Sequence, residues 1–242
     1  MLRLNHHPFA VEAHLARTTV LTYAAPAAAL QPLLPPCLAL DTYGGAGFVA
    51  VAMVQTQSLR PRGLPAWLGQ DFFLIGYRLL VRYRTRAGKR LRGLYILRSE
   101  TDRRRMALLG NLLTNYRYAH VSIAQESRPD QQRIYSPDTG LDVRVAEPAG
   151  PEPALPPGSP FTDWAQARRF AGPLPFTFAW HPPQVVIVQG QREFWTPRPV
   201  QVQAARVPFL AQLPGPLTLA SAFVTEDIPY HWQRGRTERW SA

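Results

Sequence analysis

Lysine is almost absent from this chain of 242 residues, although basic residues are abundant. The 27 basic residues are 26 arginines and the single lysine Lys89. Chemistry that needs a nucleophilic amine therefore has one candidate side chain, because arginine stays protonated and does not act as a nucleophile.

Cysteine is equally scarce. Cys37 is the only one, which excludes an internal disulfide and any zinc site built on cysteines. The histidines near the start of the chain, His6, His7 and His14, lack the company of carboxylates or cysteines that a metal site needs. The sequence therefore predicts no metal.

Long apolar runs and the common cofactor motifs are missing as well. No stretch of about 18 uncharged apolar residues occurs, so no membrane-spanning helix is expected. His, Glu and Arg interrupt the first 21 residues, which excludes a signal-peptide core. Walker and GxGxxG phosphate loops, a GxSxG nucleophile elbow and an HExxH motif do not occur. We therefore expect a cytoplasmic protein with no membrane partner and no cofactor.

A strong excess of positive charge is present instead. The net charge of +11 favours an anionic partner, which is a nucleic acid, a membrane surface or an anionic ligand. The run Arg103-Arg104-Arg105 and the alternation of aromatic residues with arginines in YRLLVRYR and YRYAH are typical of proteins that bind single strands. A basic nucleic-acid-binding module that uses arginine-rich outer faces is therefore one hypothesis.

The same arginines also suit a strand face that is open to water. An excess of arginine, 25 prolines and abundant alanine are also typical of the codon usage of a GC-rich genome, which explains the arginines without a function in binding. Nucleic-acid binding is for this reason the alternative, and a small-molecule ligand is favoured. One continuous basic stripe would support the alternative, whereas scattered arginines paired with Asp and Glu would support the small-molecule protein.

The pattern of hydrophobic residues predicts many strands and few helices. Residues 46–56 are apolar on both faces, as in a doubly buried strand. Residues 71–100 form a hairpin that turns at Ala87-Gly88-Lys89. Further strands are expected at 141–147, 183–190, 192–195, 199–207 and 217–227, with helices near 26–34, 101–113 and 161–170 and a Pro-rich loop at 147–160. The sequence predicts one domain over 1–242, mainly β (α+β), an antiparallel barrel or sandwich with short helices on its edges.

The strand expected at 116–123 has an unusual polar face. Strand side chains alternate, so Tyr116, Tyr118, His120 and Ser122 share one face, while Arg117, Ala119, Val121 and Ile123 share the other. A barrel that holds a small ligand needs apolar walls and a few polar groups, which two phenols, an imidazole and a hydroxyl supply. His120 is then a candidate general base or ligand contact. The competing interpretation is a structural polar network, or a face open to water.

The segment PAAALQPLLPPCLALDTYGGAGFVAVAMVQTQSLRPRGLP, residues 26–65, resembles the YqjF-like family of uncharacterised bacterial proteins. The resemblance continues into the hairpin, where Arg78 occupies the arginine position of a family N-x-R segment and Gly76 replaces the asparagine. Glu100 lies near the acidic position of the family. The resemblance implies a member of the acetoacetate decarboxylase-like superfamily, with an antiparallel β-barrel or cone around a central ligand-sized cavity.

The resemblance also implies what this chain lacks. In the decarboxylase branch, a lysine of a Gly-Phe-Pro-Lys-Lys segment forms a Schiff base with the keto acid. That segment corresponds here to Asn115-Tyr116-Arg117-Tyr118, which has no lysine, and Lys89 lies in a polar turn. We therefore expect a cavity for a small, anionic organic ligand without decarboxylation, and the sequence leaves open whether the protein is an enzyme. The candidate ligand-binding residues are Arg78, Glu100, Tyr116, Tyr118 and His120, and a homo-oligomer also stays open.

Overall fold

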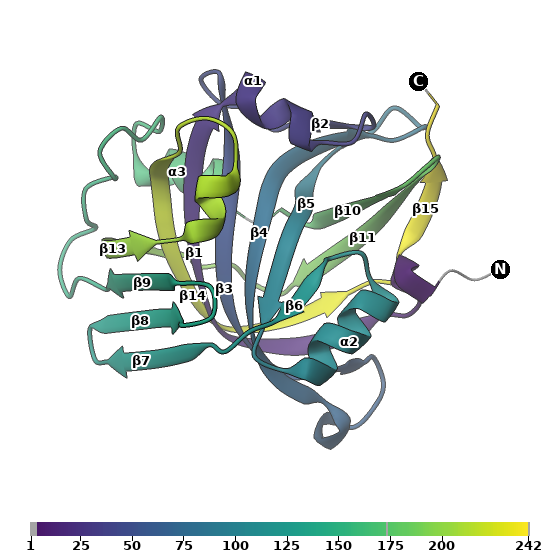
Figure 1. Cartoon of the computed structure of the whole chain (residues 1–242), viewed down its shortest axis with the longest axis horizontal. Helices are drawn as coiled ribbons and strands as arrows, with labels where there is room; N and C mark the ends of the chain where they lie inside the picture. Colours follow the sequence, from purple (N-terminus) through teal and green to yellow (C-terminus); the bar gives the residue numbers. More distant parts are fainter. Residues whose placement is uncertain (1–3, 173, 242) are drawn as a thin grey trace.

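The computed structural model describes residues 4–172 and 174–241, which form mostly strands (Figure 1). The strands are β1 (Val11–Pro26), β2 (Leu38–Leu40), β3 (Ala46–Pro61), β4 (Gln70–Arg84), β5 (Arg90–Thr101), β6 (Tyr118–His120), β7 (Ala124–Arg128), β8 (Gln131–Ser136), β9 (Leu141–Ala146), β10 (Phe176–His181), β11 (Gln184–Arg192), β12 (Arg198–Pro199), β13 (Gln201–Arg206), β14 (Thr218–Trp232) and β15 (Arg236–Arg239). The α-helices are α1 (Ala27–Leu30), α2 (Arg104–Leu113) and α3 (Trp164–Ala171), and 3₁₀ turns cover Leu4–His6, Gln31–Leu33, Ala66–Leu68 and Pro208–Gln212.

Seven strands of the larger sheet close into a barrel. Their order is β14-β1-β3-β4-β5-β10-β11, and β11 pairs again with β14 through Gly190–Arg192 opposite Tyr230–Trp232. The predicted fold class is confirmed, with one qualification of the strand directions. The pairings of β5 with β10 and of β5 with β6 are parallel, whereas the neighbouring ladders of the barrel are antiparallel.

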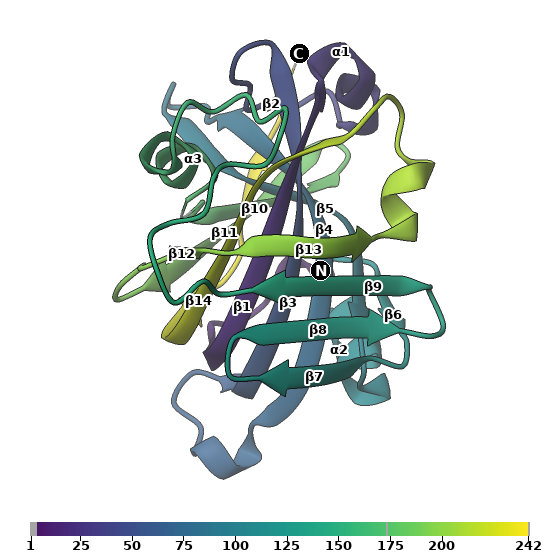
Figure 2. The same cartoon turned by 90° about the vertical axis from the view of Figure 1, so that its left-hand side faces the viewer.

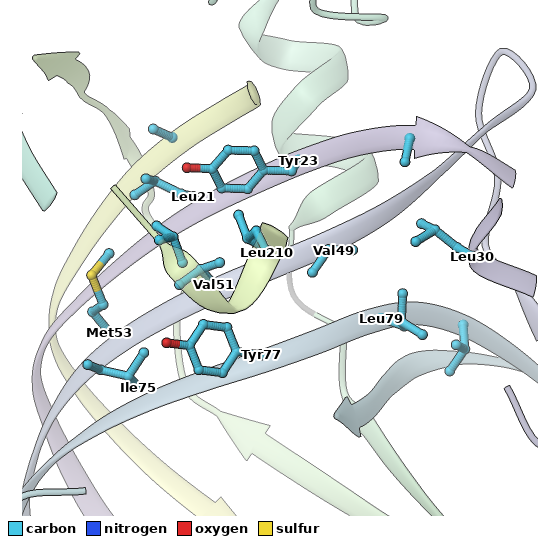
Figure 3. Packing of buried hydrophobic residues seen from close by; sticks show 14 of the residues in the cluster. Leu21, Tyr23, Leu30, Val49, Val51, Met53, Ile75, Tyr77, Leu79 and Leu210 are labelled. Carbon is cyan, nitrogen blue, oxygen red and sulfur yellow. The ribbon is translucent and has the colours of Figure 1, made fainter. Parts of the chain in front are cut away.

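The smaller sheet, β13-β9-β8-β7, runs across the outer face of the barrel (Figure 2). The main hydrophobic core lies between the two sheets. Alternate residues of β3 and β4, among them Val51, Met53, Ile75 and Tyr77, point into this core (Figure 3). The smaller sheet and the 3₁₀ turn of residues 208–212 contribute Ile134, Leu141, Val143, Val145 and Leu210.

The intervening residues of the same strands point into the barrel. Ala50, Ala52 and Val54 of β3 line an internal cavity, as do Leu74 and Arg78 of β4. Residues 46–56 are therefore apolar on both faces because one face packs in the core and the other lines the cavity. This alternation places Arg78 inside the barrel.

The three expected helical regions are present, with shifted starts. Helix α3 begins after Asp163, whose Oδ1 accepts a hydrogen bond from the Gln166 N–H at 2.7 Å. Helix α2 begins only at Arg104, because residues 99–101 continue β5. Residues 147–163 connect β9 to α3 without helix or strand. None of the described helices is long and apolar enough to cross a membrane.

Several strand predictions need correction. The strands that lie outside the expected segments are β1, β2, β7, β8, β10 and β15. In β1, buried threonines and two register shifts interrupt the alternation of apolar residues. Residues 193–195 continue no strand, since β11 ends at Arg192. Only Tyr118–His120 of the segment 116–123 is a strand, because Arg117 has a φ of 54° and the chain leaves β5 after His120 to enter the smaller sheet.

Candidate functional site

A cavity of about 600 Å³ lies inside the barrel. Its walls are the inward-facing side chains of the barrel strands, and helix α2, residues 7–9 and the connection between β3 and β4 border one end. Most of these side chains are aliphatic or aromatic. The volume is within the range of sites that hold a small organic molecule.

The charged groups of the cavity are of one sign. Four arginines line it, Arg60, Arg78, Arg105 and Arg192, and no Asp or Glu of the described residues does. Arg60 is neutralised, since its guanidinium lies 2.7 Å from Glu12. His7 also lines the cavity. Burial lowers the pKa of its imidazole, so the ring is neutral and adds no positive charge. The cavity therefore carries uncompensated positive charge.

Arg78 is the most deeply enclosed of these arginines. It makes no ion pair with any described residue, and its buried Nε has no hydrogen-bond partner there. Burial lowers its pKa. Gly76 provides the space for it, because a Cβ at this position would lie 2.7 Å from the Arg78 Nε. An isolated guanidinium in an apolar wall destabilises a fold unless an anion joins it.

Arg192, the last residue of β11, is a second enclosed cation. Its guanidinium lies 4.5 Å from the centre of the Trp195 ring and 5.4 Å from that of Tyr230. Burial lowers the pKa of Arg192 too. The Trp195 Nε1 is buried and has no acceptor among the described residues. The site thus has a further donor beside its cations.

Three tyrosines, Tyr116, Tyr118 and Tyr230, surround Arg78 and interact with it electrostatically. Burial raises the pKa of all three phenols, that of Tyr118 to about 12, so they stay protonated at neutral pH. Protonated phenols donate hydrogen bonds. The arrangement is suited to holding an anion, and these phenols are not suited to act as bases.

Two further glycines make room for these tyrosines. A Cβ at Gly110 of α2 would lie 2.4 Å from the Tyr118 ring, and a Cβ at Gly190 would lie 2.1 Å from the Tyr230 hydroxyl. Three polar side chains of the cavity therefore each pack against a glycine: Arg78 against Gly76, Tyr118 against Gly110 and Tyr230 against Gly190. Any larger residue would displace the side chain that it faces.

The structure brings together three of the five candidate residues, Arg78, Tyr116 and Tyr118, on the cavity wall. The rings of Tyr116 and Tyr118 have centroids 6.4 Å apart. Their shared side does not come from a continuous strand, because Tyr116 precedes β6.

The placement expected for His120 is wrong. His120 is exposed and does not line the cavity, and Ser122 is exposed as well. The physical reason is the length of β6, which ends at His120, so the alternation that starts at Tyr118 does not extend over the cavity. His120 is therefore not part of the candidate site.

The placement expected for Glu100 is also wrong. Alternation along β5 directs Ser99 into the cavity and Glu100 into the core behind it. There, Glu100 accepts a hydrogen bond from the Tyr77 hydroxyl at 3.0 Å and lies 3.0 Å from the Arg98 guanidinium. Burial raises the pKa of Glu100, and its two partners counteract this. Glu100 is part of a structural network.

Sequence reasoning missed Arg192, Trp195 and Tyr230. One signal for Arg192 is in the sequence, since Gly190-Gln191-Arg192 repeats the Gly-x-Arg pattern of Gly76-Tyr77-Arg78. In a strand, this spacing puts the glycine beside the arginine on the same face. No comparable signal marks Tyr230. Among the described residues, no group of His, Cys, Asp and Glu is arranged to hold a metal ion.

Comparison with known proteins gives a family and a fold. The DUF2071 family, described as an uncharacterised conserved protein, matches residues 12–225. No curated protein matches the chain. Acetoacetate decarboxylase from Legionella pneumophila is similar in structure, with a TM-score of 0.62 and 12% identity over 96% of this chain and 88% of that one.

Two other solved structures are similar to the same degree. An acetoacetate decarboxylase-like enzyme from Sphingomonas wittichii has a TM-score of 0.58 and 15% identity, over 98% of this chain and 94% of its own. The enduracididine biosynthesis enzyme MppR, complexed with pyruvate, has a TM-score of 0.60 and 13% identity. The match covers 97% of this chain and 92% of the MppR chain. At these identities the likeness shows the fold alone, and this fold is the acetoacetate decarboxylase-like fold that the resemblance implies.

Proposed function

The chain belongs to the DUF2071 family, and we propose that it is a cytoplasmic protein that binds a small organic carboxylate with an apolar body inside the barrel. The observation that carries this proposal is the pair of enclosed arginines, Arg78 and Arg192, in a cavity whose described lining contains no acid. A carboxylate would pair with Arg78, offset one of the two positive charges and accept hydrogen bonds from the neighbouring phenols.

The cavity has a polar region, which would bind the carboxylate of the ligand, and an apolar region, which would bind its apolar body. Arg78, Tyr116, Tyr118 and Tyr230 would hold the carboxylate, because they supply donors and positive charge at one place. The aliphatic and aromatic remainder of the cavity favours an apolar body, since apolar burial stabilises binding by about 25 cal/mol per Å². MppR, which has a similar fold, was solved with pyruvate, a carboxylate of the same chemical class.

The nucleic-acid alternative is not supported. Many arginines are scattered over the fold and paired with acids, as the small-molecule hypothesis expects: Arg17, Arg60, Arg82, Arg92, Arg98, Arg133, Arg144, Arg168, Arg198 and Arg236 each lie within 4.0 Å of an Asp or Glu. Such pairs reduce the charge that an outer face presents to a phosphate backbone.

Calorimetry with octanoate, octanamide and octylamine tests the proposal, because these probes share a chain length and differ in charge. We expect octanoate to bind at least about tenfold more tightly than the amide, since hydrogen bonds to a charged group contribute about 1.5–3 kcal/mol. Octylamine should not bind, and acetate should bind more weakly than octanoate. Equal affinity for octanoate and octanamide would contradict the proposal.

A Schiff base is not expected on this chain. Lys89 is exposed in the turn between β4 and β5 and does not line the cavity. Treatment with acetoacetate and borohydride should therefore leave Lys89 unmodified in peptide mass spectrometry. The Legionella decarboxylase serves as the positive control, and a stoichiometric adduct on Lys89 would show that this prediction is wrong.

A further inference from the structure

Large hydrophobic side chains are exposed mainly around one end of the cavity. Seven large hydrophobic residues of the described chain are exposed, and six of them belong to residues 7–9, the connection between β3 and β4 (residues 62–69) or helix α2. These six are Phe9, Leu64, Trp67, Leu68, Leu108 and Leu112, and we call them the apolar rim. Trp67 and Leu108 are 79% and 71% exposed. Single exposed hydrophobics are ordinary, but such a concentration marks an interaction surface.

The three segments of the apolar rim are tied to one another. The Gln70 side-chain amide donates to the Met106 sulfur of α2 at 3.6 Å, and the His7 N–H donates to the Leu113 carbonyl at 2.9 Å. The Arg62 N–H donates to the Ala10 carbonyl at 2.9 Å. In Figure 1, α2 and the connection between β3 and β4 lie at the same end of the barrel.

The cavity opens at the apolar rim. Phe9, Leu64 and Leu68 line the cavity and are also exposed to solvent, as is Arg105. A residue can do both only at an opening. The apolar lining of the cavity and the apolar rim are therefore one continuous surface.

Arginines accompany the apolar rim. Arg62, Arg104 and Arg105 are exposed and make no ion pair with a described residue, while Arg103 lies 3.8 Å from Asp102. The last three stand at the N-terminus of α2, which has no acid in its first turn. Positive charge is unfavourable at this end of a helix, so these arginines do not stabilise it. Their position is favourable only when an anionic partner faces it.

From these observations we infer that the apolar rim docks the protein onto the surface of an anionic phospholipid bilayer, with the cavity opening toward the lipid. Tryptophan and leucine insert at the boundary between headgroups and acyl chains, and arginines attract anionic headgroups. Nucleic acid would leave the exposed leucines without a function, and a second copy of this chain would bring like charges together. The inference revises the expectation of no membrane partner, which rested on the absence of a spanning segment.

Vesicle flotation tests the docking. We expect the protein to float with vesicles of mixed phosphatidylcholine and phosphatidylglycerol and to stay behind with phosphatidylcholine alone. Rising salt should release it, because surface charges are screened. Equal binding to both vesicles, or binding to neither, would overturn the inference.

Paired variants locate the surface. Trp67→Ser with Leu68→Ser, and separately Arg104→Ser with Arg105→Ser, should each reduce the vesicle-bound fraction at least about tenfold. Their melting temperatures should not fall below that of the wild type, because all four side chains are exposed and Arg104 and Arg105 do not stabilise the N-terminus of α2. Phe194→Ser with Arg84→Ser is the control, since both residues are exposed and lie outside the apolar rim. Vesicle binding that persists in both rim variants, or a rim that instead binds an oligonucleotide or a second copy in sedimentation, would refute membrane docking.

Discussion

Arg78→Met should weaken carboxylate binding on the order of 100-fold and at the same time make the protein more stable. Losing the cation from an enclosed site weakens octanoate binding by about 2–4 kcal/mol, or on the order of 100-fold. In the unliganded protein, the guanidinium has no ion pair among the described residues, and the phenols and apolar side chains around it carry no negative charge to offset its own. Removing it should raise the free energy of unfolding by about 1–2 kcal/mol. Titration calorimetry and urea denaturation measure the two effects.

The opposite signs of these two changes distinguish a binding arginine from a structural one. Arg84→Met is the matched control, because Arg84 lies on the same strand, is exposed and does not line the cavity. It should leave octanoate binding unchanged and alter stability by less than about 0.5 kcal/mol. If Arg78→Met binds octanoate like the wild type, or unfolds more easily, the role assigned to Arg78 is wrong.

Gly93→Ala should produce the largest loss of stability among the glycine substitutions of the barrel strands. Gly93 lies on β5 opposite Phe176 of β10, where a parallel ladder closes the barrel. A Cβ at Gly93 would lie 2.3 Å from the Phe176 carbonyl oxygen and 2.7 Å from the Phe178 ring. Because the Phe176 carbonyl oxygen belongs to the backbone, the steric clash is removed only if β5 and β10 move apart. We expect the free energy of unfolding to fall by about 3 kcal/mol.

Urea denaturation of Gly93→Ala and Gly150→Ala measures this effect against a control. A Cβ at Gly150 meets no atom within 4 Å, and its backbone is not in the left-handed region. The control variant should therefore remain within about 0.5 kcal/mol of the wild type. Equal stability of the two variants would mean that β5 and β10 do not approach each other as described.

Local pattern was enough to predict much of the hairpin and part of the site. In the sequence, Tyr77, Leu79 and Val81 alternate with Arg78 and Arg82, and β4 directs the first three side chains into the core and Arg78 into the cavity, because period-two geometry depends only on the chain itself. Asp163 begins α3 through a hydrogen bond three residues away. Such features need no information about the rest of the fold.

The predictions for His120 and Glu100 were wrong because the positions of these side chains depend on the tertiary structure and not on the local sequence. The prediction for His120 extended a local alternation past the point where the tertiary structure ends it, and the prediction for Glu100 rested on the resemblance to the family, which does not fix the face of β5 on which Glu100 lies. Strand β6 stops at His120 because the chain turns toward the second sheet, and nothing within residues 116–123 specifies that sheet. Glu100 faces the core because β5 presents Ser99 to the cavity, which depends on how β5 is placed in the barrel.

By itself, the sequence determined the strand-rich class, the faces of β4 and the presence of a single lysine, Lys89, because each depends on residue type and local spacing. Only the tertiary structure decided that Arg192 and Tyr230 join Arg78. They lie on β11 and β14, and residues more than a hundred positions apart in the chain meet Arg78 through the closure of β5 on β10 and of β11 on β14. That closure depends on glycines that admit a neighbouring backbone or side chain, and sequence spacing does not reveal which neighbour each glycine faces.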